Sequence, residues 1–129
     1  MRIGNLDTYL LLETFLLEGG CPVLRVEAVS SGPRRKFVAT HERVVMDSGA
    51  AVAQRLTDFA ELRSDRFETA LSEGGWLRFQ RKALGAIVVR YRIGGVAVSM
   101  LAAMEGEVLV DGEFSNGFCQ EFGALLESL

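Results

Sequence analysis

The sequence predicts one α+β domain over residues 1–129, in which two amphipathic helices pack on a largely antiparallel sheet of about six to seven strands. The predicted order is βββ-α-βββ(β)-α. Two observations predict this class. Short apolar segments separated by glycine and proline clusters fill the first third, and a segment of helical spacing follows each strand-rich part. A chain of this length can bury a core without help from metals or disulfides.

The first third predicts a meander of three strands joined by turns. The strands cover residues 8–17, 23–30 and 36–45, and the turns cover 19–22 and 31–33.

The first of these strands is also compatible with a helix. Its leucine-rich sequence would suit a helix capped by Asn5 or Asp7 and ended by Gly19. Glu13 and Thr14 interrupt the apolar stripe that such a helix needs, so the segment is assigned to a strand.

After Val45 the apolar residues follow helical spacing, and Asp47 or Ser48 can accept hydrogen bonds from the first-turn amides. The stripe consists of Val52, Leu56, Phe59 and Ala60. The helix is predicted to end near Arg63. Residues 64–75 fit both a helical turn and a strand alternation, and they are assigned to neither.

Beyond Trp76, alternating apolar residues predict a hairpin whose two-residue turn is Gly94–Gly95. Its strand residues are Ile87, Val89, Tyr91 and Ile93, then Val96, Val98 and Met100. A further strand near residues 107–110 follows a turn at Glu105 and Gly106. Ser115 is predicted to cap the closing helix, whose apolar face consists of Phe118, Phe122, Leu125 and Leu129.

Charge is distributed unevenly along the chain. The formal net charge is −3, which argues against a dedicated nucleic-acid binder. Residues 93–129 contain no lysine or arginine, whereas the stretch 76–92 contains five cations and no carboxylate. We expect an exposed acidic surface that attracts a basic partner. The candidate partner-binding residues are Glu105, Glu107, Asp111 and Glu113. Solubility charge, or pairing with Arg90 and Arg92, is the alternative.

No catalytic, cofactor-binding or metal-ligating set is apparent in the sequence. The single histidine, His41, lies in a predicted strand without a placed partner, and Cys21 and Cys119 lack the close spacing of a zinc site. Cys119 suits a small residue packed beside Phe122 better than a reactive thiol at a helix start. The chain also lacks a secretory signal core and an apolar run of bilayer length, which predicts a cytoplasmic protein.

The element order, the helix of residues 52–62 and Gly75–Trp76 together resemble small bacterial immunity proteins of polymorphic toxins, of the wall-associated toxin immunity type and related families. Many of these carry Gly-His-Val at the central hairpin, where this chain has Gly94, Gly95 and Val96. The resemblance covers nearly the whole chain. It implies a protein that neutralises its partner by contact, with no catalytic residues.

The sequence therefore predicts a non-enzymatic protein-binding module, immunity-like, that neutralises a basic partner such as a toxin domain. A homo-oligomeric scaffold or a small-ligand-binding domain is the alternative. No cofactor and no membrane association are expected.

Overall fold

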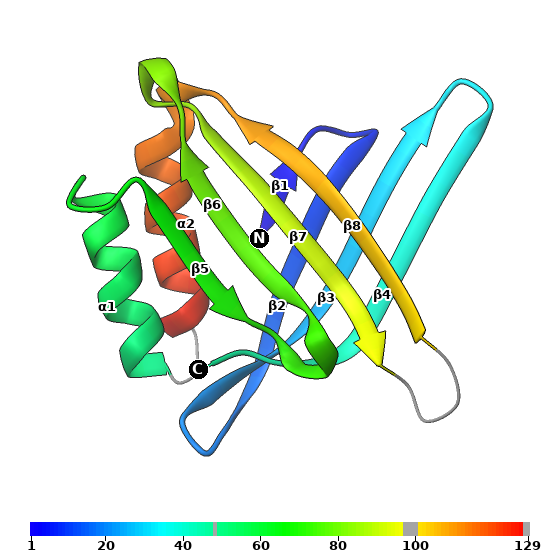
Figure 1. Ribbon diagram of the computed structural model, residues 1–129, viewed down its shortest axis with the longest axis horizontal. Coiled ribbons are helices and arrows are strands. Elements are labelled where there is room, and N and C mark those ends of the chain that lie inside the picture. The colour runs from blue at the N-terminus through cyan, green and yellow to red at the C-terminus, as the bar shows by residue number, and fades with distance from the viewer. Residues whose placement is uncertain (48, 97–100, 128–129) are drawn as a thin grey trace.

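The computed structural model describes residues 1–47, 49–96 and 101–127. It confirms the α+β class, but the prediction of one sheet of six to seven strands was wrong in detail. The described residues form eight strands in two antiparallel sheets of four, with two helices, in the order ββββ-α-ββββ-α. The strands of the two sheets cross in Figure 1, and both helices lie beside β5 and β6.

The first sheet has the order β1-β2-β3-β4 and the second has the order β5-β6-β7-β8. The strands of the first sheet are β1 (Arg2–Gly4), β2 (Thr8–Glu18), β3 (Cys21–Gly32) and β4 (Arg35–Val45). The second sheet contains β5 (Arg66–Ala70), β6 (Trp76–Arg81), β7 (Ile87–Val96) and β8 (Leu101–Val110). The helices are α1 (Gly49–Ala60) and α2 (Ser115–Glu127), and single 3₁₀ turns are η1 (Ser72–Gly74), η2 (Ala83–Gly85) and η3 (Gly112–Phe114).

The predicted three-stranded meander is confirmed as β2, β3 and β4. The ambiguous first segment is a strand, because Leu10 and Leu12 alternate onto the buried face while Glu13 is exposed. Leu12 lies opposite Val26 of β3, and both side chains are buried. The leucines therefore follow the two-residue period of a strand. In a helix, Leu10 and Leu12 would lie on different faces.

Strands β1 and β5 were not predicted, and no residue bounds were predicted for β6. Residues 64–75 were assigned to no element, yet β5 lies within them. Phe67 and Thr69 are buried and point to the same side, and Phe67 pairs with Phe79 of β6. The strand alternation was the correct interpretation of this segment. Strand β1 has three residues, of which only Ile3 is buried, and so it is too short to produce a periodic signal.

A hairpin is present where one was predicted, but its strands are β7 and β8, the predicted separate strand at residues 107–110 is the end of β8, and both predicted turns were wrong. Gly94 and Gly95 lie inside β7, opposite Ala103 and Ala102. Residues 97–100, including Val98 and Met100, lie outside the described residues. Glu105 and Gly106 are also not a turn, because they pair with Arg92 and Tyr91 in the middle of β8.

The glycine in β8 makes room for a neighbouring ring. A Cβ atom on Gly106 would lie 2.2 Å from the hydroxyl oxygen of Tyr91, so this ring covers the bare backbone of the glycine. Glycine inside a strand often marks such a close approach.

Both helices are confirmed with small differences. Helix α1 ends at Ala60, three residues earlier than predicted, and Asp47 forms an ion pair with Arg55 at 3.6 Å. The other proposed cap, Ser48, lies outside the described residues, as does Leu129. Ser115 is the first residue of α2, and its hydroxyl donates a hydrogen bond to the carbonyl of Gly112 at 2.9 Å.

The core is one continuous cluster from both sheets and both helices. The helices cover the inner face of β5 and β6, and the first sheet faces β7 and β8. Phe79 lies at the centre of the helical side. The centroid of its ring is 6.0 Å from Phe59, 4.8 Å from Phe67, 4.9 Å from Phe118 and 5.0 Å from Phe122.

Candidate functional site

The candidate site follows the free edge of β8. This strand is the last of its sheet, and only β7 pairs with it among the described residues. Its register with β7 runs from Leu101 to Val110 without a bulge. Two hollows follow the unpaired side of the strand, one along residues 103–107 and the other along residues 107–111. Both hollows are bordered by Glu107 and Thr8.

The first hollow, which we call the β4–β8 cleft, has a volume of about 860 Å³ and lies between the two sheets. Its β4 side includes Phe37 and Ala39, and its β7 side includes Tyr91 and Ile93. Burial raises the pKa of the Tyr91 hydroxyl above its usual value. The cleft therefore combines apolar walls with a phenol that stays protonated and can donate a hydrogen bond.

The second hollow, which we call the β1–α2 groove, also has a volume of about 860 Å³. It lies between β1, the end of β8 and the first turns of α2. Its acidic residues are Glu107, Asp111, Glu113 and Glu121, and the cation that lines it is Arg2. The guanidinium of Arg2 lies 4.0 Å from the centre of the Tyr9 ring.

The structure brings the four predicted partner-binding residues to this one edge. All four are exposed, as expected. Glu105 and Glu107 lie within β8, Asp111 follows the strand, and Glu113 lies in η3. The predicted turn at Glu105 was wrong, because both glutamates pair with arginines of β7 inside the strand.

The two glutamates in β8 are partly neutralised by β7. Arg92 donates to Glu105 at 3.0 Å, and Arg90 donates to Glu107 at 2.9 Å. Exposed ion pairs of this kind contribute about 0.2–1 kcal/mol each. The pairing alternative raised by the sequence therefore applies to half of the predicted acidic set.

The remaining acidic residues carry the negative charge of the edge. Among the described residues, no ion pair or side-chain hydrogen bond involves Asp111, Glu113 or Glu121. Glu121 was not among the predicted site residues. Glu121 follows Gly117 by four residues, so the sequence could have placed both on one face of the closing helix. Only the structure shows that this face borders the groove beside β8.

Apolar side chains flank this acidic group. Leu109 is 59% exposed and Phe114 is 60% exposed, an unusual state for large apolar residues. Both line the β1–α2 groove. An acidic groove with apolar residues at its side resembles the mixed surfaces through which proteins bind one another.

His41 has a partner that the sequence did not reveal. Its Nε2 atom lies 3.2 Å from a carboxylate oxygen of Glu73, in the wall of the β4–β8 cleft. In the described part of the chain, no hydroxyl or thiol is hydrogen-bonded to this imidazole. The imidazole thus lies beside a carboxylate, and among the described residues it lacks the hydrogen-bonded nucleophile of a hydrolase.

The cysteines do not form a reactive pair. Both are free thiols, and Cys119 is buried in the core. Burial raises the pKa of the Cys119 thiol more than the nearby Arg81 lowers it. Its packing role is therefore favoured over a thiolate. No group of three metal-ligating side chains occurs among the residues that the structure describes.

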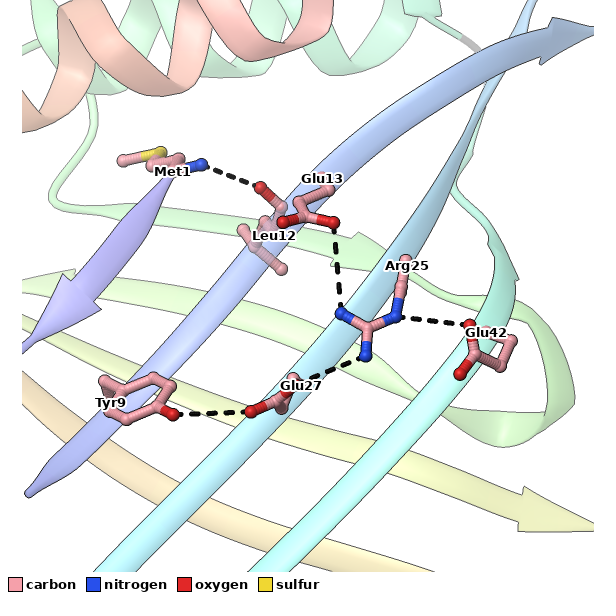
Figure 2. Close-up of polar contacts among 7 residues, drawn as sticks. All are labelled: Met1, Tyr9, Leu12, Glu13, Arg25, Glu27 and Glu42. Atoms are coloured by element: carbon pink, nitrogen blue, oxygen red, sulfur yellow. Dashed lines mark hydrogen bonds and ion pairs between the residues drawn. The ribbon is translucent and has the colours of Figure 1, made fainter.

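The outer face of the first sheet has a charged network of its own, which Figure 2 shows. Arg25 lies 3.2 Å from Glu42, 3.3 Å from Glu27 and 3.9 Å from Glu13, and the Tyr9 hydroxyl donates to Glu27. One guanidinium already serves these carboxylates. The network therefore offers a weaker attraction for a basic partner than the unpaired carboxylates beside β8.

Three arginines of the basic stretch, Arg78, Arg90 and Arg92, lie on the outer face of the second sheet, whereas Arg81 points to the helical side and donates a hydrogen bond to the carbonyl of Phe59 at 3.0 Å. Arg78 forms an ion pair with Glu68 at 2.9 Å and covers the Trp76 ring at 3.8 Å. Trp76 is thus half-buried on the outer face of this sheet and not in the core. Arg90 and Arg92 are also paired, so three arginines of this face are already neutralised and attract nucleic acid less strongly than free cations would.

No match to this chain was found among models of protein families, curated proteins or solved structures. In the part of the chain that the structure describes, no helix combines the length and hydrophobicity needed to cross a lipid bilayer.

Proposed function

We propose that this chain is a non-enzymatic protein-binding module that engages a basic partner along the free edge of β8. The observation that carries the proposal is the arrangement of Asp111, Glu113 and Glu121. These carboxylates have no ion-pair partner among the described residues, and they line the β1–α2 groove together with the exposed side chains of Phe114 and Leu109. An immunity-like role, in which the module blocks a basic toxin domain by contact, fits such a surface.

Charge is expected to act mainly on the rate of association. Exposed charges of one sign steer an oppositely charged partner during diffusion, and salt screens this effect over about 8–10 Å. The apolar residues beside the acidic group would then contribute to the lifetime of the complex, because their burial removes apolar surface from water.

The test compares two variants with the same net charge. The groove variant neutralises the four carboxylates that line the β1–α2 groove and combines Glu107→Gln, Asp111→Asn, Glu113→Gln and Glu121→Gln. The control variant neutralises four exposed carboxylates elsewhere: Glu18→Gln, Glu42→Gln, Glu61→Gln and Asp65→Asn. Each tagged chain is used to capture proteins from its native cell lysate at low and high salt. We then measure association rates with the recovered basic protein.

The groove variant should associate about tenfold more slowly at low salt and should show a flatter salt dependence. The control should behave as the unmodified chain does. Equal association by all three chains would contradict the acidic-edge proposal. If the chain recovers only itself, and its mass in solution falls on dilution from a dimer to a monomer, the homo-oligomer takes the place of the proposed module.

A further inference from the structure

The edge of β8 lacks most of the features that protect strand edges in natural proteins. Exposed edges are commonly blocked by proline, lysine, a bulge or a very short strand. Strand β8 has ten residues, a continuous register and neither proline nor lysine. Among the described residues, no backbone hydrogen bond joins it to β1, although the two strands approach each other at Gly4 and Val108. The edge is thus a template for an added strand.

The outer face of the second sheet indicates which side chains an added strand would carry. One row of cross-strand neighbours runs Glu68, Arg78, Arg90 and Glu107, and it ends at β8. The next row ends at Glu105, beside Arg92. A strand added beyond β8 would place its side chains directly against these two glutamates. Opposite charges stabilise such cross-strand pairs, so lysine or arginine is favoured there.

The inner side of β8 has a different environment. Met104 and Gly106 border the β4–β8 cleft, whose walls include Phe37 and Ile93. Successive side chains of a strand point to opposite faces. Every second residue of an added strand would therefore face the β4–β8 cleft, which has a volume of about 860 Å³, and an apolar residue is favoured where Met104, Phe37 and Ile93 line it.

We propose that an extended segment of the basic partner pairs with β8 as a fifth strand of the second sheet, with lysine or arginine alternating with apolar residues. This inference rests on the proposed function and specifies how the partner is recognised. Main-chain hydrogen bonds would supply affinity, and the alternating side chains would supply specificity. A second copy of β8 is a poor occupant, because its own Glu105 and Glu107 would lie against the same residues.

The test uses synthetic peptides and the isotope-labelled full chain. The first peptide alternates arginine or lysine with valine or leucine. The second has the same side chains, but every second backbone nitrogen is methylated, which removes the donors that a strand needs. The third has glutamate in place of the cations. Amide chemical shifts of residues 103–107 report binding at this edge.

The first peptide should shift these amides, and the methylated peptide should bind about tenfold more weakly, as expected when a backbone hydrogen bond is lost and its partner is left unpaired. The variant Glu105→Lys/Glu107→Lys should lose the cationic peptide and gain the glutamate peptide. The milder Glu105→Gln/Glu107→Gln variant removes both negative charges without adding positive ones. It should weaken binding of the cationic peptide only.

The variant Glu68→Lys is the matched control, because Glu68 forms an equivalent ion pair on the opposite edge strand. It should leave peptide binding unchanged. Equal affinity for the methylated and unmethylated peptides would overturn strand addition while leaving the acidic contact intact. Failure of the cationic peptide to shift residues 103–107 would also overturn it. The proposed function fails separately, if the groove variant associates normally with the captured partner.

Discussion

Replacing Phe79 by alanine should lower the free energy of unfolding by about 3–5 kcal/mol, the usual cost of truncating a buried phenylalanine. The ring is 1% exposed and contacts aromatic rings from both helices and from β5. Its removal leaves a cavity where the two helices meet the second sheet, and the surrounding rings cannot all move to fill it. Urea denaturation followed by circular dichroism measures the change.

The same substitution at Phe114 provides the control. This ring is 60% exposed, so Phe114→Ala should change the free energy of unfolding by less than about 0.5 kcal/mol. It should, however, shorten the lifetime of the complex with the basic partner. Equal losses of stability at Phe79 and Phe114 would contradict the placement of the core.

The second large effect is expected at Gly112, in the turn between β8 and α2. A Cβ atom at this position would lie 2.1 Å from the carbonyl oxygen of Leu84, which belongs to the backbone of η2. A backbone atom cannot yield as the end of a flexible side chain can. Gly112→Ala should therefore destabilise the fold by about 1–3 kcal/mol, as other overpacked substitutions do. Thermal unfolding measures this change.

Gly117 is the matched glycine, and its substitution should have the opposite sign. It lies in α2, and no atom lies within 4 Å of a Cβ built on it. Alanine has the higher helix propensity, so Gly117→Ala should raise stability by about 0.5–1 kcal/mol. A loss of stability in Gly117→Ala, or a gain of stability in Gly112→Ala, would contradict the packing described here between the end of β8, η2 and α2.

Strands and helices with a long periodic signal could be predicted from the sequence. The meander and the two helices have enough alternating or helically spaced residues for the buried face to be identified. Turns within β7 and β8 could not, because Gly94–Gly95 and Gly106 have the composition of turns but occupy strands. At Gly106 the reason is tertiary, since the Tyr91 ring occupies the space that a side chain would need. The division of the strands into two sheets is not marked by any local sequence pattern.

Part of the candidate site was also predictable. The absence of cations after Ile93 identified the acidic residues that the fold gathers along β8. Their pairing was only suggested, because the register that places Glu105 and Glu107 against arginines depends on where the hairpin turns. The groove itself could not be foreseen, since it forms where β1, β8 and α2 meet from distant parts of the chain.

The most direct test of the central claim is amide hydrogen exchange of the chain alone and in complex with its captured basic partner. In an edge strand, alternate backbone amides point away from the neighbouring strand and exchange readily until another strand covers them. We expect slower exchange at the outward amides of residues 103–107 in the complex. Protection confined to other surfaces, such as the exposed Phe15–Leu17 tip of the β2–β3 hairpin, with exchange in β8 unchanged, would contradict it.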